Sequence, residues 1–225
     1  MKALLRILVF VAAVLVLSLA LKAQSLAPHA EMPQLPVKIL MQSPADTQTD
    51  LQIICLFRSS PENTLHGSLL ETNEKLHGLL DRIRRPDRFG GELGETLVLT
   101  PPPGTLAAKK LLLIGLGDSA TFAPERMRFI GKVAIREANR IGVAHPFFAP
   151  TILDGGVTQF GTGQVAEQVV RGFREAIATH ALVEDAGAAS PRIVQDFTFL
   201  AGPKFAADTQ AGIDRALALS EPPAK

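Results

Sequence analysis

Short apolar runs alternate along this chain with longer segments whose apolar residues recur every three or four positions. The runs are typical of buried strands, and the longer spacing is typical of helices that cover a sheet. The alternation predicts an α/β fold, with a mixed, mostly parallel sheet and helices on both faces. The expected strands are residues 37–41, 51–57, 96–100, 109–114, 143–149 and 193–200, and the expected helices are residues 68–84, 124–141, 164–182 and 208–219.

The segment from Lys109 to Asp118 carries the clearest strand–turn–helix pattern. Its apolar run stops at Gly115-Leu116-Gly117, and a helix with Pro124 in its first turn follows. Further upstream, Ser68 with Glu71 three residues later predicts a capping box at the start of the first helix.

The N-terminus has the pattern of a targeting segment. Residues 1–23 start with basic residues and continue as an apolar run from Ile7 to Leu21, which is typical of a secretory signal peptide. We expect cleavage after Ala23, with the triplet Ser18-Leu19-Ala20 as a second site. Leu21 is a poor residue three places before the cut, so an uncleaved membrane anchor remains the alternative. In both cases the rest of the chain is expected to be exported, either periplasmic or secreted.

The remaining chain divides into three parts. Residues 24–36 hold three prolines and no periodicity and are interpreted as a linker. Residues 37–219 are expected to form the folded domain, and residues 220–225 a short tail.

Composition narrows the classes of function. The 225 residues carry a net charge of +1, with twelve Phe and no Trp or Tyr, so nucleic-acid binding is not expected. Membrane contact is expected only through an uncleaved N-terminal segment. Cys55 is the single cysteine, which excludes an intramolecular disulfide and a cysteine metal cluster. It is interpreted as a buried strand residue, with a nucleophile as the alternative.

The order of these motifs resembles the N-terminal domain of the leucyl aminopeptidase family, the M17 peptidases. The matching pieces are the strand 51–57, the helix around Leu76-His77-Gly78-Leu79-Leu80, the turns Phe89-Gly90-Gly91 and Gly94-Glu95, the segment 110–117, the helix with Arg128, and the helix 165–177 with Gly172. The resemblance implies a three-layer α-β-α domain related to macro domains. In the family this domain precedes a separate catalytic domain that binds two divalent metals, and it helps assembly.

The catalytic signature of that second domain, Asn-Thr-Asp-x-Glu-Gly-Arg, does not occur in this sequence. The chain ends about where that domain is expected to begin. No catalytic or metal-binding residue is therefore assigned, and no cofactor is expected. The five histidines do not form a His-x-x-x-His or His-Glu-x-x-His pattern either.

Two glycine-rich turns that precede helices are the candidate ligand sites. Backbone N–H groups at such turns can face an anion, and open α/β sheets bind ligands at the carboxyl ends of their strands. The candidate residues are Gly115, Gly117, Gly155, Gly156, Gly161 and Gly163. Ala120 replaces the third glycine of a dinucleotide fingerprint, and Asp118 would repel a phosphate. Simple tight turns are the alternative interpretation.

A basic stripe is the remaining candidate surface. Arg128, Lys132, Arg136 and Arg140 lie four residues apart on one predicted helix face, which would suit a polyanion or an acidic partner. A solvated outer helix face is the alternative.

The preferred hypothesis is an exported, non-catalytic binding or assembly domain. It would contact a protein partner or further copies of itself, or hold a small ligand. One alternative is a component of a metal-dependent aminopeptidase whose catalytic domain is a separate chain. Another is a macro-like binder of a nucleotide or ADP-ribose.

Overall fold

The computed structural model describes residues 35–60 and 64–218. The predicted targeting segment, residues 24–34 of the predicted linker and the predicted tail lie outside this part. Within the described residues, no helix has the length and apolar character needed to cross a membrane.

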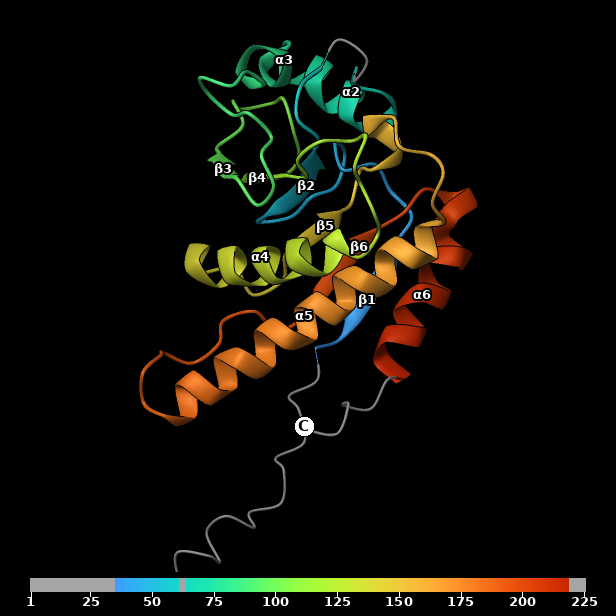
Figure 1. Ribbon diagram of the computed structural model, residues 1–225. Helices are drawn as coiled ribbons and strands as arrows, with labels where there is room; N and C mark the ends of the chain where they lie inside the picture. Colours follow the sequence, from blue (N-terminus) through green and yellow to red (C-terminus); the bar gives the residue numbers. More distant parts are fainter. Residues whose placement is uncertain (1–34, 61–63, 219–225) are drawn as a thin grey trace, which may run out of the picture. The chain divides into compact units, whose positions relative to one another are not determined.

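The centre of the fold is a six-stranded sheet with the order β1-β6-β5-β2-β4-β3 (Figure 1). Its strands are β1 (Val37–Leu40), β2 (Gln52–Leu56), β3 (Thr96–Leu99), β4 (Leu111–Gly115), β5 (Phe147–Ala149) and β6 (Phe197–Leu200). Only β3 runs antiparallel to its neighbour, β4. The other four strand pairs are parallel, which confirms the predicted mixed, mostly parallel sheet.

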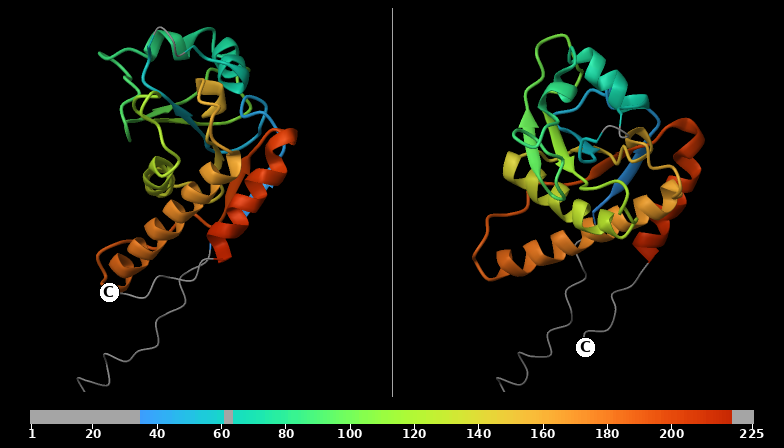
Figure 2. Two further views of the ribbon diagram at one scale, coloured as in Figure 1. Left: turned by 45° about the vertical axis from the view of Figure 1, so that its right-hand side comes forward. Right: turned by 45° about the horizontal axis from the view of Figure 1, so that its top comes forward.

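Helices cover both faces of this sheet, as Figures 1 and 2 show. The helices are α2 (Gly67–Lys75), α3 (Leu79–Ile83), α4 (Arg126–Ile141), α5 (Thr162–Asp185) and α6 (Ala206–Ala218), with short 3-10 turns η1 (Leu153–Gly155) and η2 (Pro203–Phe205). Successive residues of a strand point to opposite faces. On β2, Ile54 and Leu56 therefore join the core under α2 and α3, whereas Ile53 and Cys55 join the core under α4, α5 and α6. The three layers are confirmed.

Several predicted boundaries were wrong. The single helix expected over residues 68–84 is two helices, because His77 and Gly78 adopt left-handed backbone conformations, with φ of 54° and 74°. The strands β5 and β6 begin later than the predicted 143 and 193. Pro146 lies just before β5 and has no N–H to donate to a ladder.

The packing of α4 on α5 depends on two glycines. A Cβ atom at Gly131 would lie 2.3 Å from the carbonyl oxygen of Val169, and one at Gly172 would lie 2.1 Å from the carbonyl oxygen of Arg128. The two helix backbones are therefore in direct contact, with no room for a side chain between them.

This contact predicts that a glycine-to-alanine substitution destabilises the protein, whereas helix propensity alone predicts stabilisation. Propensity favours alanine over glycine inside a helix by about 1 kcal/mol. Because the new methyl group would collide with backbone, we expect Gly172→Ala to lower the free energy of unfolding by about 1–3 kcal/mol instead. Urea denaturation measures this, with Thr179→Ala at an exposed position of α5 as the control. An unchanged or increased stability of Gly172→Ala would contradict the contact.

Candidate ligand-binding pocket

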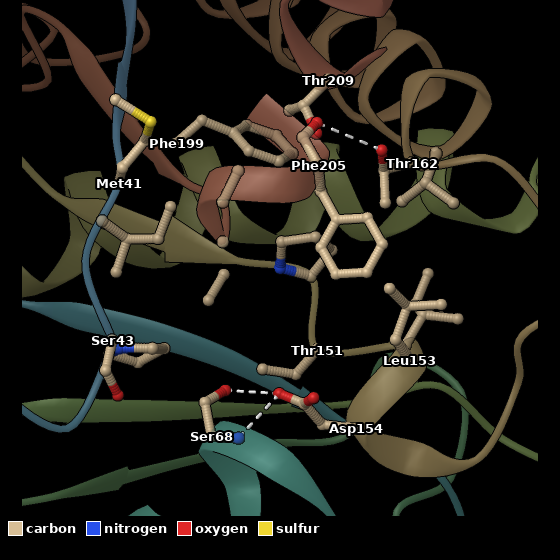
Figure 3. A pocket seen from close by; sticks show the side chains of 18 of the residues that line it. Met41, Ser43, Ser68, Thr151, Leu153, Asp154, Thr162, Phe199, Phe205 and Thr209 are labelled. Carbon is tan, nitrogen blue, oxygen red and sulfur yellow. Dashed lines mark hydrogen bonds between the residues drawn. The ribbon is translucent and has the colours of Figure 1, made fainter. Parts of the chain in front are cut away.

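A cavity of about 410 Å³ opens at the carboxyl ends of β1, β5 and β6 (Figure 3). The segments that follow these strands form much of its wall, namely residues 41–44, 149–154 and 199–203. Side chains from α2, from the start of α5 and from α6 complete it. Its position agrees with the general rule that open α/β sheets bind ligands beyond the carboxyl ends of their strands.

Thr151 fixes the loop between β5 and η1. Its backbone has a φ of 46°, which is unusual for a residue other than glycine. Its Oγ1 donates a hydrogen bond to the carbonyl oxygen of Cys55 (2.6 Å) and accepts one from the Cys55 N–H (2.9 Å). The side chain thus continues the pairing of β5 with β2 beyond the last residue of the strand and holds the cavity wall against the sheet.

Cys55 itself lies in the centre of the sheet with no exposed surface. Burial raises the pKa of its thiol well above the usual range, because the low-dielectric core disfavours the thiolate. Its position fits the interpretation as a buried strand residue rather than a nucleophile.

Asp154 joins the same loop to the start of α2. Its carboxylate accepts hydrogen bonds from the backbone N–H of Ser68 (3.2 Å) and from the Ser68 hydroxyl. The predicted capping box was therefore wrong. The group that satisfies the start of α2 comes from 86 residues away in the sequence, and the carboxylate of Glu71 instead accepts from the hydroxyl of Ser43 (2.5 Å).

Asp208 has the corresponding role at the start of α5. Its carboxylate accepts hydrogen bonds from the Gly163 N–H (2.7 Å) and the Thr162 hydroxyl (2.9 Å). These hydrogen bonds, that from Gly163 above all, lower the pKa of the Asp208 carboxyl below its ordinary value of 3.8. The N-terminal amide that an anionic ligand would use is consequently bound to an internal carboxylate.

None of the six predicted glycines is among the residues that line the cavity. A Cβ at Gly115 would lie 2.0 Å from the carbonyl oxygen of Glu92, one at Gly155 would lie 2.7 Å from the ring of Phe57, and one at Gly163 would lie 2.5 Å from the carbonyl oxygen of Asp208. These three glycines allow close packing. Gly117 and Gly156 have φ of 75° and 88°, and Gly161 precedes α5. Direct ligand contact by the six glycines stays a prediction.

The walls of the cavity are mostly apolar. They include Phe160, Phe199 and Phe205, together with aliphatic side chains from the loop after β5 and from α5. Among the described residues, the charged side chains in the lining are the carboxylates of Glu71 and Asp154, and no Lys or Arg lines the cavity. No local pattern in the sequence marks this set of residues, because its members come from six separate segments of the chain.

The predicted basic stripe lies on α4, where much of its charge is paired within the molecule. Arg128 and Lys132 both form ion pairs with Glu175 of α5, and Arg140 pairs with Glu137 at 2.6 Å. Burial opposes ionisation of Glu175, but the hydrogen bonds from the two cations outweigh it and lower the pKa of its carboxyl. Binding of a polyanion or partner by this stripe stays a prediction.

No group of three or more His, Cys, Asp or Glu side chains is placed to hold a metal ion within residues 35–60 and 64–218.

Comparison with known proteins identifies the family. Residues 53–178 match the model of the cytosol aminopeptidase family, N-terminal domain. This match covers more than half of the chain, and the chain therefore belongs to that family through its N-terminal domain.

Curated relatives agree with this assignment. A probable cytosol aminopeptidase from Thermosynechococcus vestitus is 33% identical over 106 residues, which are 45% of this chain and 21% of the relative. One from Alkaliphilus metalliredigens is 28% identical over 104 residues, 46% of this chain and 20% of the relative. The chain thus spans about a fifth of the length of these relatives.

Solved structures share the fold. A leucine aminopeptidase from tomato has a TM-score of 0.53 at 17% identity, covering 82% of this chain and 36% of the tomato chain. A macrodomain from Oceanobacillus iheyensis has a TM-score of 0.58 at 11% identity, and the match covers 84% of this chain and 96% of the macrodomain chain. A Trypanosoma brucei macrodomain in complex with ADP-ribose has a TM-score of 0.57 at 15% identity, and the match covers 85% of this chain and 73% of the macrodomain chain. The predicted macro-like α/β fold is confirmed.

The cap on α5 predicts a pH dependence. The pKa of Asp208 is lower in the folded than in the unfolded chain, so its contribution to stability is present above pH 3.8 and is lost as the pH falls below that value. We expect Asp208→Ala to lower the free energy of unfolding by about 1 kcal/mol at pH 7, as for other lost caps. The difference from the wild type should shrink below pH 3.8.

Urea denaturation between pH 3 and pH 7 measures both effects. Asp214→Ala is the control, at an exposed position of α6, the helix that carries Asp208. It should not show the pH-dependent difference. If the free energy of unfolding of Asp208→Ala lay below that of the wild type by the same amount over this whole pH range, a charge-dependent cap would be contradicted.

Proposed function

We propose that this chain is an exported, non-catalytic binding or assembly domain derived from the aminopeptidase N-terminal domain, and that it holds a small ligand in the cavity. The observation that carries the proposal is the cavity of about 410 Å³ at the carboxyl ends of β1, β5 and β6. Ligand pockets in proteins are typically concave, mostly apolar and of roughly 300–1,000 Å³, with a few polar groups that fix orientation. This cavity has those properties.

The family match supports the non-catalytic part of the proposal. The matched model is that of the N-terminal domain, and the signature of the family's catalytic domain does not occur in the sequence. The basic and then apolar pattern of residues 1–23 supports export.

A nucleotide is the less favoured ligand. Binding of a diphosphate by the loop after β5 would need free backbone N–H groups, and these are used within the loop. Gly155 donates to Thr151 (3.1 Å), Gly156 to Leu153 (3.0 Å), and Val157 to Ile152 (3.2 Å). ADP-ribose is present in a neighbouring macrodomain structure, but the likeness to that structure concerns the fold alone.

The second candidate function is a component of a metal-dependent aminopeptidase. The curated relatives are named probable cytosol aminopeptidases, and the chain corresponds to about a fifth of each. In this hypothesis the domain would dock on a separate catalytic chain. Co-purification with a chain that carries only the metal-binding domain would favour it over the first proposal.

A direct assay tests the non-catalytic part. We expect the purified full-length chain, assayed with Mn²⁺ or Zn²⁺, to hydrolyse leucyl-p-nitroanilide no faster than the same buffer and metal without protein. A full-length leucyl aminopeptidase assayed in parallel is the positive control. Metal-dependent turnover that increases in proportion to the concentration of the chain and disappears with a chelator would refute this part.

Export has its own test. We expect the protein to be recovered from outside the cytoplasm with an N-terminus at Gln24, determined by mass spectrometry of the intact protein. A chain that keeps Met1 and sediments with membranes would indicate the uncleaved anchor. Recovery of the intact chain from the cytoplasmic fraction would contradict export.

A further inference from the structure

The charges and hydrogen bonds of the cavity restrict the chemistry of its ligand. Resting on the proposed ligand-binding function, we propose that the cavity takes a small apolar amine. Its aromatic or branched body would lie among the phenylalanine rings, a neutral hydrogen-bonding group would meet Thr209, and its ammonium group would face Glu71 and Asp154.

Thr209 is the first observation. It lies on α6, lines the cavity and is only 2% exposed. The hydrogen bonds between α5 and the start of α6 in the described part of the chain use Phe205 and Asp208 and do not involve the Thr209 hydroxyl. The carbonyl oxygen of Phe205, one turn earlier, instead accepts from the hydroxyl of Thr162 (3.4 Å). The hydroxyl is not among the polar atoms that are fully shielded from solvent without a partner, because it borders the cavity. A ligand group in the cavity can therefore form a hydrogen bond with it, and such a bond contributes to binding.

The second observation is the apolar middle of the cavity. Figure 3 shows the side chains of Phe199 and Phe205 beside Thr209. Phe160 also lines the cavity and stacks edge to face on Phe122, with ring centroids 5.7 Å apart. These rings favour a ligand with an aromatic or branched body.

The third observation is the sign of the charge. Figure 3 shows Asp154, Ser68 and Ser43 across the cavity from Thr209. The carboxylates of Asp154 and Glu71 belong to the lining, and no Lys or Arg within residues 35–60 and 64–218 does. Lys75 contacts this acidic side from outside the cavity, where it pairs with Glu71 at 3.4 Å and with Asp46.

This arrangement selects against anions. Lys75 pairs with Asp46 and Glu71, and the Asp154 carboxylate adds a further negative charge to the lining, so an anionic group here would meet a net negative field. The N–H groups of Ser68 in α2 and Gly163 in α5, which could offset this field, already donate to Asp154 and Asp208. A ligand ammonium group, by contrast, gains from the uncompensated carboxylate charge.

Four related probes separate these contributions in binding experiments on the full-length chain. Tyramine carries a phenol and an ammonium group, tyrosol replaces the ammonium with a hydroxyl, 3-(4-hydroxyphenyl)propionate replaces it with a carboxylate, and phenethylamine lacks the phenol. We expect tyramine to bind about tenfold more tightly than the carboxylate and several-fold more tightly than tyrosol or phenethylamine, as one lost charge-assisted or neutral hydrogen bond implies.

Two variants connect each preference to its residue. Asp154→Asn keeps a side-chain oxygen for Ser68 but removes the charge, so it should lose most of the preference for tyramine over tyrosol. Thr209→Val removes only the hydroxyl and should abolish the preference for tyramine over phenethylamine. Asp214→Asn is the matched charge control at an exposed position of α6 and should bind like the wild type. Circular dichroism checks that each variant is folded.

Isothermal titration and chemical shifts of the lining residues give the readout, with ADP-ribose as a fifth probe. The inference is overturned if the carboxylate probe binds as tightly as tyramine, or if both variants bind all probes like the wild type. It is also overturned if no amine shifts the lining residues at 5 mM. If ADP-ribose shifted these residues and no amine did, the proposal of an amine ligand would be overturned, but the ligand-binding role would stand. Metal-dependent peptide turnover would refute the proposed function itself.

Discussion

The cavity depends on the contact between the backbones of α5 and α6. A Cβ atom at Gly212 of α6 would lie 2.0 Å from the carbonyl oxygen of Gly163 at the start of α5, so the two helices touch without intervening side chains. Asp208 strengthens the same crossing by accepting from the Gly163 N–H. Together these contacts bring Thr209 to the α5 side of the cavity. A larger residue at either glycine would separate the helices and remove the wall on which Thr209 lies.

The opposite wall depends on side chains that replace backbone pairing. Thr151 bonds to both polar groups of the Cys55 backbone, and Asp154 satisfies the first turn of α2. One loop is thereby attached to the sheet and to α2. The N–H and hydroxyl of Ser68, which could otherwise donate to an anion, donate to Asp154 instead.

Much of the fold was predictable because it follows from local patterns. The apolar runs identified the strands, and the three- and four-residue spacing identified α4 and α5, including the buried face with Met127 and Ile130. The site was predictable only as a region, the carboxyl edge of the sheet. Thr209 and Asp154 lie far apart in sequence and have no motif around them. The glycine-rich turns are local patterns, and the structure shows close packing at Gly115, Gly155 and Gly163.

The pairing of Arg128 and Lys132 with Glu175 has a consequence for how this surface can change over evolution. The positive charges stand on α4, but the residue that neutralises them stands on α5. The electrostatic character of the α4 face is therefore encoded outside α4. A homologue with a neutral residue at this single position would present two uncompensated cations without any change in its basic residues, and an anion-binding surface could arise in one mutational step.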